Sequence, residues 1–368
     1  MGEVSAPRFD LVVVGAGIVG CAAAALAARA PGARVLLLDR SLVGRGATQY
    51  SAGIDVPLAR TDRQRELVRT SAAFYRALRE REPGTPVVPL PLLWVVAEPA
   101  RAAFEAAHCG PPPALAGADA IARARAHLPG WRIAPRTRVY AEERATYGFA
   151  APLAEQLARA VAAVPGCAVW EGVQIDALAA DAGGVRLTVH DGRRLEAERV
   201  LVATGPWLAR GPLAAGLPPG ALRVKKIVAL HLPEPPGAGA PGLCFFEDDA
   251  YLVPVRERGH WLFSFTSDEW DVAPEASSLA VSARDRALAR AILDRHAPGL
   301  SERAAAGRVF CDAYAADRLP LIALGAAGRV AYASGGAGSG YRLAPGIAAA
   351  ALAQFAFADQ ENPYARTR

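Results

Sequence analysis

Cysteine is scarce in this sequence and shows no functional spacing. The 368 residues include five cysteines, with no Cys-x-x-Cys pair and no metal-ligand spacing; they are Cys21, Cys109, Cys167, Cys244 and Cys311. Disulfide frameworks and zinc sites have the opposite pattern. We therefore expect no metal site and a protein of the reducing cytoplasm.

Histidine clusters and basic blocks are also lacking. His190, His231 and His260 form no spaced cluster, so each is interpreted as a solvated or core side chain. The formal net charge of +5 comes from scattered arginines rather than from a basic block with interleaved aromatic residues, which argues against nucleic-acid binding. The chain has no internal repeat and no low-complexity tract.

One uncharged segment, residues 11–28, could be mistaken for a targeting signal. Glu3 and Asp10 stand where a signal peptide carries positive charge, and glycines and alanines dilute the apolar character of the segment. We favour a buried strand and helix here over a signal peptide or a membrane anchor. No other stretch is long enough to span a bilayer, so we expect no membrane partner.

The chain has the composition of a globular protein, with 52% hydrophobic and 21% charged residues, and its length predicts about two domains. An apolar run at 10–14, a helical stretch at 18–29 and a second apolar run at 34–38 predict one βαβ unit. Further helices are expected at 62–82, 149–164 and 279–296. Strands are expected at 169–175, 185–190, 200–203, 223–232, 250–255 and 260–266, and residues 92–140 look loop-rich.

This order predicts an α/β fold in which a Rossmann-type domain carries an inserted antiparallel-sheet α+β substrate domain. The nucleotide-binding domain is expected to be discontinuous and to comprise residues 1–85, 141–220 and 315–368. Residues 86–140 and 221–314 are expected to form the substrate domain.

The segment Gly15-Ala-Gly17-Ile-Val-Gly20 follows the first strand and opens the first helix. In that position the glycines allow a tight turn, close approach of a pyrophosphate and close helix packing, and the helix N-terminus binds the phosphates. Asp39 ends the second strand, about 20 residues further on, where a carboxylate can accept both ribose hydroxyls. The motif predicts dinucleotide binding, and both FAD and NAD use it.

Four later segments resemble the D-amino-acid oxidase, glycine oxidase and sarcosine oxidase family. They are Gly44-Arg-Gly-Ala-Thr48-Gln-Tyr-Ser51-Ala52-Gly53, Val200-Leu-Val-Ala-Thr204-Gly205-Pro-Trp207, Tyr251-Leu-Val-Pro-Val and Ala333-Ser-Gly335-Gly-Ala-Gly338-Ser-Gly340-Tyr-Arg342-Leu-Ala-Pro345-Gly346. Their order covers essentially the whole chain, and the resemblance implies FAD as a non-covalent cofactor in a Rossmann-type FAD-binding domain.

The motif and the resemblance together place a set of residues at the cofactor. They are Gly15, Ala16, Gly17, Ile18, Val19, Gly20, Asp39, Arg40, Ala47, Thr48, Ser51, Ala52, Gly53, Val173, Thr204, Gly205, Trp207, Gly335, Gly338, Gly340, Tyr341, Arg342 and Leu343. Pro345 is expected at the start of a helix whose positive end faces the flavin.

The resemblance also implies two catalytic residues. Arg342 would hold a substrate carboxylate by two parallel hydrogen bonds, against the alternative of an interdomain ion pair. Tyr251 would donate its hydroxyl to the same carboxylate, or it is a core tyrosine. Glycine oxidase-like relatives carry a second carboxylate-binding arginine near Asp312, which this chain lacks, so a simple small α-amino acid is not the expected substrate.

Two further features have a structural interpretation. Some sarcosine oxidase relatives attach FAD through a cysteine near Cys311, but the local sequence is offset by one residue, so a buried free thiol is expected. Four aromatic residues in and after the strand at 260–266 are expected mainly in the core; they are Trp261, Phe263, Phe265 and Trp270.

The reaction that the resemblance implies is oxidation of the C–N bond of an amino acid or amine. Hydride passes from carbon to flavin N5, water hydrolyses the imine, and oxygen is reduced to hydrogen peroxide. Two alternatives stay open. One is a dehydrogenase that acts on an amine or a hydroxy acid and passes electrons to a quinone or protein acceptor; the other is an FAD-binding subunit of a hetero-oligomeric amine oxidase. The oligomeric state is open.

Overall fold

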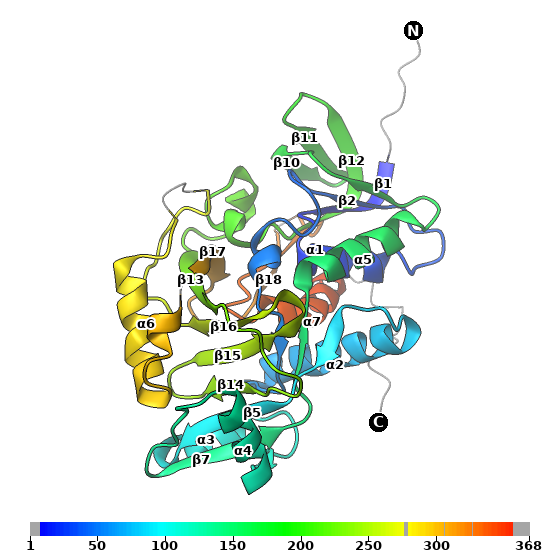
Figure 1. Cartoon of the computed structure of the whole chain (residues 1–368). Helices are drawn as coiled ribbons and strands as arrows, with labels where there is room; N and C mark the ends of the chain where they lie inside the picture. Colours follow the sequence, from blue (N-terminus) through cyan, green and yellow to red (C-terminus); the bar gives the residue numbers. More distant parts are fainter. Residues whose placement is uncertain (1–7, 276–278, 305, 326, 356–368) are drawn as a thin grey trace.

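The computed structural model describes residues 8–275, 279–304, 306–325 and 327–355. Two large sheets share the chain, and helices cover them (Figure 1). Glu3 and the outer ends of the predicted nucleotide-binding domain, 1–7 and 356–368, lie outside the described residues.

The first sheet has a parallel centre formed by continuous apolar runs. Its strands are β1 (Arg8–Val14), β2 (Val35–Leu38), β9 (Ala168–Trp170), β10 (Ile175–Asp181), β11 (Gly184–Val189), β12 (Arg194–Val202), β18 (Leu321–Leu324) and β19 (Val330–Ser334). β19, β12, β1, β2 and β9 pair in parallel, and β10, β11 and β18 add antiparallel edges. Leu11 to Val14 are buried, as expected for a strand covered on both faces.

Helices α1 (Ile18–Ala27), α5 (Ala150–Ala162) and α7 (Gly340–Ala353) pack together beside this sheet, and α2 (Asp62–Arg81) packs on α7. Alanines make up half of α1 and let these helices approach closely. The predicted βαβ unit and the predicted helices at 62–82 and 149–164 agree with the structure.

The second sheet is almost entirely antiparallel. In order its strands are β17 (Ala306–Tyr314), β13 (Arg223–Leu232), β16 (His260–Phe265), β15 (Ala250–Val255), β14 (Gly242–Phe245), β5 (Leu92–Ala97), β7 (Thr137–Glu142) and β6 (Ala114–Leu115), and only β14 and β5 pair in parallel. Helices α4 (Ala118–His127) and α6 (Ala283–His296) contribute to its core, and α3 (Arg101–Ala107) packs near β5. A third sheet contains β3 (Ile54–Asp55), β8 (Thr146–Gly148) and β4 (Val87–Pro89).

The strands of the two large sheets come from different parts of the chain. Residues 8–38, 168–202 and 321–334 supply the first sheet, and residues 92–142, 223–265 and 306–314 supply the second. The discontinuous domain division made from the sequence has the same order of segments; its exact boundaries stay a prediction.

The structure corrects three expectations about local structure. Residues 92–140 are not mainly loop, since β5, α3, α4 and most of β7 lie there. The expected strand at 169–175 is the end of β9 and the start of β10, because Gly172 takes a positive φ of 72° between them. Pro345 lies inside α7, which already begins at Gly340.

Pro345 is tolerated inside α7 because α2 replaces the hydrogen bond that proline removes. Proline has no N–H to donate to Tyr341 O, and the hydroxyl of Tyr75 donates to that oxygen instead (2.6 Å). The next N–H, of Gly346, donates to Ser71 Oγ (2.9 Å). A Cβ at Gly346 would lie 2.4 Å from Leu67 O, so α2 and α7 are in backbone contact and hold the start of α7 firmly.

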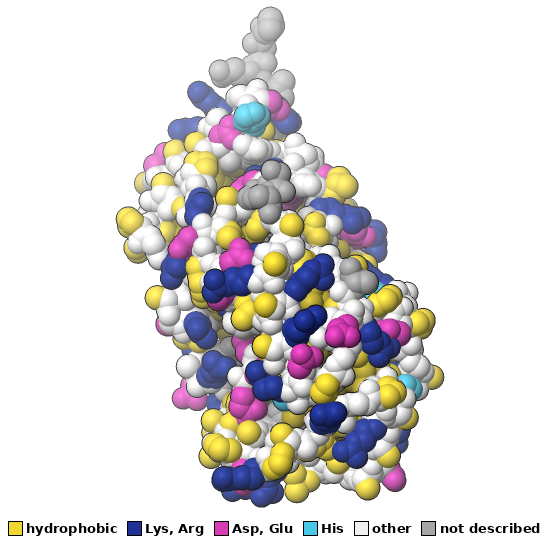
Figure 2. Space-filling view, turned by 60° about the vertical axis from the view of Figure 1, so that its left-hand side comes forward, with side chains coloured by type: hydrophobic (Ala, Val, Ile, Leu, Met, Phe, Trp, Pro, Cys, Tyr) yellow, Lys and Arg dark blue, Asp and Glu magenta, His cyan; other side chains and the backbone are white. Residues whose placement is uncertain are grey.

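The surface shows charges of both signs. Figure 2 shows Lys and Arg side chains interspersed with Asp and Glu over one face, without a large patch of one sign. Among the described residues no helix combines the length and the apolar character needed to cross a bilayer.

Candidate active site

A cavity of about 930 Å³ lies between the two large sheets and is lined by residues from both. The carboxyl ends of β1, β12 and β19 and the residue after β2, Asp39, open onto it. In parallel α/β sheets this edge is where ligands bind. The opposite wall comes from β13, β15, β16 and β17 of the second sheet.

The β1–α1 turn forms one end of the cavity. Gly15 has φ of +108°, and a Cβ there would lie 2.6 Å from Ala203 O, so this turn accepts only glycine. Gly17 caps α1 without a side-chain hydrogen bond, and the first turn contains no acidic residue. Ile18 N–H donates to Thr48 Oγ1 (3.0 Å). The positive end of α1 is therefore open to an anion.

Asp39 is fixed beside this turn. Its Oδ2 accepts from Ala16 N–H (2.7 Å) and its Oδ1 accepts from Ser41 N–H (2.8 Å). Each carboxylate oxygen keeps a second lone pair for a ligand hydroxyl. Next to it, the guanidinium of Arg40 lies 4.9 Å from the ring centre of Trp207, whose buried Nε1 has no hydrogen-bond partner among the described residues.

The glycine loop between β19 and α7 forms another part of the wall. Gly335, Ala337 and Gly338 all have positive φ, so the loop folds back on itself. Asp312 on β17 holds it, because its Oδ2 accepts from Gly338 N–H (2.6 Å). Burial raises the pKa of Asp312 to about 6, against the lowering effect of its two backbone donors.

Arg342, from the first turn of α7, lines the cavity and is oriented by backbone oxygens. Its Nη1 donates to Leu58 O (2.7 Å) and to Val56 O (3.3 Å), and no other hydrogen bond or ion pair of Arg342 is found within the described ranges. Burial lowers its pKa, and Asp55, whose own pKa burial raises to about 6, counteracts this. Nη2 and Nε remain as donors for a ligand.

Tyr251 lines the cavity from β15, next to Ser264 of β16. Burial raises the pKa of its phenol, so it stays a neutral donor over the physiological range. Apolar side chains of the same wall surround this region, namely Ile227, Phe265 and Phe310.

The cavity brings together all but four of the residues predicted from the sequence. Ala16, Gly20 and Gly53 support its wall from behind: Ala16 fixes Asp39, and a Cβ at Gly20 or Gly53 would lie 1.8 Å from a backbone oxygen. Leu343 is a correction. It is fully buried in the core between the helices, because the residue after Arg342 points about 100° away around the helix.

Two residues that line the cavity were not predicted from the sequence. Lys225 and Asp249 line it, and neither belongs to a recognisable motif. The sequence contained one signal for Lys225, the pair Lys225-Lys226 beside a run of apolar residues in the same strand. His231 and His260 were also taken as isolated, but their rings lie 4.4 Å apart because β13 pairs with β16.

The geometry agrees with the expectations for Cys311, Trp261 and Phe263. Cys311 is a buried free thiol outside the cavity wall, and burial raises its pKa to about 11. Trp261 and Phe263 are core residues, whereas Phe265 is buried and also reaches the cavity. No group of three His, Cys, Asp or Glu residues that could hold a metal is found in the part of the chain that the structure describes.

Comparison with known proteins assigns this chain to a family. Residues 10–354 match the family model described as FAD dependent oxidoreductase (DAO), so the chain belongs to this family and is an FAD-dependent oxidoreductase. No curated protein matches the sequence.

Solved structures share the fold at low sequence identity. Glycine oxidase from Geobacillus kaustophilus is 21% identical with a TM-score of 0.75, and 95% of each chain is covered. Iminodiacetate oxidase from Chelativorans sp. BNC1 is 21% identical with a TM-score of 0.72 over 92% of this chain and 93% of that one. L-proline dehydrogenase from P. horikoshii is 17% identical with a TM-score of 0.76, covering 98% and 96%.

The residues of the cavity fit FAD. The open N-terminus of α1 suits the pyrophosphate, and Asp39 presents lone pairs to a ribose. Two buried polar atoms without partners among the described residues, Trp207 Nε1 and Tyr341 Oη, belong to residues of the wall. The uncapped start of α7 adds a second positive helix end at the other side of the cavity.

Proposed function

We propose that this protein oxidises the C–N bond of an amino acid or a secondary amine and that oxygen is the electron acceptor, giving hydrogen peroxide. One observation carries the proposal: Arg342 and Tyr251, from different domains, line the same cavity as the residues that fit FAD. An arginine oriented by backbone oxygens and a neutral tyrosine are suited to holding a carboxylate.

The protein's own residues would orient the substrate and exclude water. Nη2 and Nε of Arg342 would donate to the substrate carboxylate, and the Tyr251 hydroxyl would donate to the same group. The apolar side chains of Ile227, Phe265 and Phe310 would exclude water from the reacting carbon. The β1–α1 turn and Asp39 would hold FAD, which would supply a hydride acceptor beside that carbon. The substrate amine would lose a proton as C=N forms, and water would hydrolyse the imine.

Two alternatives remain as candidates. The same cavity would serve a dehydrogenase that passes electrons from an amine or hydroxy acid to a quinone or a protein. It would also serve an FAD-binding subunit of a hetero-oligomeric amine oxidase. The five free thiols accord with a cytoplasmic location, which stays a prediction.

An anaerobic flavin-bleaching screen tests the proposal. The purified, FAD-loaded protein is mixed with D-, L- and N-alkyl amino acids and with simple amines, and air is then admitted. Bleaching that reverses in air with release of hydrogen peroxide is expected. Bleaching that persists in air until a quinone is added would instead establish a dehydrogenase. No bleaching by any amine would contradict amine oxidation by this chain alone.

Arg342→Ala tests the assignment of the carboxylate site. We expect KM for carboxylated substrates to rise at least about tenfold, since a charge-assisted pair is lost, while FAD stays bound. Arg69→Ala, an exposed arginine of α2 paired with Glu66, is the control. Unchanged kinetics, or an equal loss for amines without a carboxylate, would remove Arg342 from substrate binding.

A further inference from the structure

Lys225 and Lys226 are adjacent on β13 and are both buried, with 5% and 2% of their surface exposed. Successive side chains of a strand point to opposite faces of the sheet. Lys225 accordingly lines the cavity, whereas Lys226 points toward α6 on the other face.

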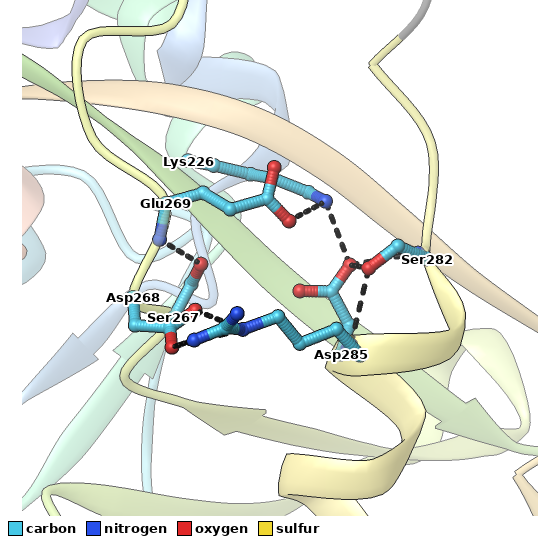
Figure 3. Close-up of polar contacts among 7 residues, drawn as sticks. Lys226, Ser267, Asp268, Glu269, Ser282 and Asp285 are labelled. Atoms are coloured by element: carbon cyan, nitrogen blue, oxygen red, sulfur yellow. Dashed lines mark hydrogen bonds and ion pairs between the residues drawn. The ribbon is translucent and has the colours of Figure 1, made fainter.

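Lys226 is paired with two carboxylates of the protein. Its Nζ lies 2.7 Å from Glu269 Oε1 and 2.7 Å from Asp285 Oδ2 (Figure 3). Asp285 in turn accepts from the N–H of Ser282, which caps α6. Figure 3 shows Glu269 and Asp285 pointing toward the lysine from the loop after β16 and from α6. This lysine has a structural explanation.

Lys225 lacks such partners. Within the described residues no carboxylate is in ion-pair distance of its Nζ and no hydrogen-bond acceptor is found for it. Instead the ammonium lies 5.0 Å from the ring centre of Trp270 and 5.5 Å from that of Tyr314. The lysine is 5% exposed and lines the cavity, so an anion that enters the cavity would supply the acceptor that the described residues do not.

The surroundings of Lys225 are held in place rather than loose. Its cross-strand neighbour Asp312 is already engaged by the N–H groups of Gly338 and Ala313. The loop carrying Trp270 is attached to β13, since Lys226 N–H donates to Glu269 O (2.9 Å) and Asp271 N–H donates to Val224 O (2.6 Å). The aromatic walls around the ammonium are therefore fixed before any ligand arrives.

Asp249 lines the same cavity as Lys225 and Arg342. Its carboxylate acts on both cations, raising the pKa of each against the effect of burial. Thr266 Oγ1 donates to Asp249 Oδ2 (2.8 Å), which fixes the carboxylate at the cavity wall. The cavity wall thus carries two cations and one carboxylate whose charge acts on both.

We propose that Lys225 binds a second anionic group of the substrate, so that the substrate is an amine carrying two carboxylates. One carboxylate would lie at Arg342 and the other at Lys225, with the amine facing Asp249. The arrangement of charges in such a molecule is the complement of the arrangement on the wall. The part of the proposal that concerns the amine rests on the proposed function; the anion site at Lys225 does not.

Ligand binding without turnover tests the proposal. Unreactive dicarboxylates (succinate, glutarate and adipate) are titrated into the FAD-loaded protein beside the monocarboxylates of equal length (butyrate, pentanoate and hexanoate), by calorimetry and by the flavin absorption spectrum. We expect at least one dicarboxylate to bind ten times or more tighter than its matched monocarboxylate. Equal affinity in all three pairs would overturn the proposal.

Variants of Lys225 test whether this residue causes the preference for dicarboxylates. Lys225→Met should abolish the preference for the dicarboxylate, and Lys225→Arg, which keeps the charge, should retain most of it. Arg223→Met is the matched control, because Arg223 lies over the same Trp270 ring (4.9 Å) but is exposed and paired with Asp271. A preference that survives in Lys225→Met, or a variant altered only in the rate at which oxygen reoxidises the flavin, would also overturn the proposal.

The test separates this inference from the proposed function. If amines bleach the flavin and Lys225→Met binds dicarboxylates as the unchanged protein does, the anion site is wrong and amine oxidation stands. If no amine bleaches the flavin but the preference depends on Lys225, the anion site stands and amine oxidation is wrong.

Discussion

Each face of β13 carries a buried lysine, but in the described part of the chain the protein supplies acceptors for only one of the two. On the face toward α6, Lys226 donates to two carboxylates, those of Glu269 and Asp285, and Asp285 also accepts from Ser282. On the cavity face, the Lys225 ammonium lies over two aromatic rings and forms no ion pair or hydrogen bond within the described residues. Burial is therefore not what separates a structural lysine from a candidate ligand-binding one. The difference lies in whether the protein itself supplies the acceptors.

Helix N-termini show the same contrast. Helix α6 begins with a capping box, in which Ser282 and Asp285 bond each other's backbone N–H groups. Helix α1 begins at Gly17 with no side-chain bond from its cap residue and no acidic residue in its first turn. The start of α6 is closed by its own side chains, and the start of α1 is the helix end that we predict to hold the phosphates of FAD.

The largest effect is expected from breaking the partnered lysine. Lys226→Met leaves the buried carboxylate of Asp285 without its cation, and such a change costs about 3–5 kcal/mol of unfolding free energy. Lys225→Met removes a buried charge that has no protein partner, so it should cost far less. Urea unfolding of both FAD-saturated variants measures the difference. Equal losses would show that the two lysines do not differ as described.

One acidic residue of the cavity wall, Asp312, should make the free energy of unfolding depend on pH. Asp312 is half-buried and forms no ion pair within the described residues, and burial raises its pKa from the ordinary 3.8 to about 6. Between these values the native state binds more protons than the unfolded state, so this group makes stability fall as pH rises from about 4 to 6, by on the order of 2 kcal/mol.

Asp312→Asn should flatten that fall, because the amide oxygen can still accept from Gly338 N–H and no charge forms. Unfolding free energies measured at pH 4, 5, 6 and 7 show the slope. Asp317→Asn, in the exposed turn after β17, is the control and should leave the slope in place. An unchanged slope in Asp312→Asn would mean that its carboxyl ionises at its ordinary pKa in the folded protein.

The nucleotide end of the cavity was predictable because its determinants are local. Val14, Gly15, Gly17 and Asp39 lie within one βαβ unit, where apolar runs and glycines specify strand, turn and helix over short distances. Pro345 was misplaced because the partner that makes it tolerable, the Tyr75 hydroxyl, lies on another helix.

The substrate end could not be predicted in the same way. Lys225 meets Asp312 through the register of β13 with β17, and Asp249 reaches the cavity from the turn between β14 and β15. Such registers depend on packing over the whole sheet and leave no short motif. The resemblance supplied Arg342 and Tyr251, but residues particular to this chain, such as Lys225, emerge only from the structure.

The smallest effects are expected from two substitutions, one that removes the cap of α6 and one that adds an acidic residue to the first turn of α1. Ser282→Ala opens the cap of α6 and should cost about 1 kcal/mol of unfolding free energy, with the FAD content unchanged. Val19→Asp places an acid in the first turn of α1. Relative to Val19→Asn, which loses the same apolar packing, it should stabilise the FAD-free protein by no more than about 1 kcal/mol through the helix dipole.

The carboxylate introduced by Val19→Asp would also face the pyrophosphate, so FAD affinity should fall at least about tenfold, a difference of about 1.4 kcal/mol. Fluorescence titration of the FAD-free protein with FAD measures this, and Val19→Asn controls for the change of shape without the charge. If Val19→Asp bound FAD as tightly as Val19→Asn, the N-terminus of α1 would not hold the phosphates. The open end of α1 would then need a structural explanation like that of α6, and the contrast between the two helices would lose its functional meaning.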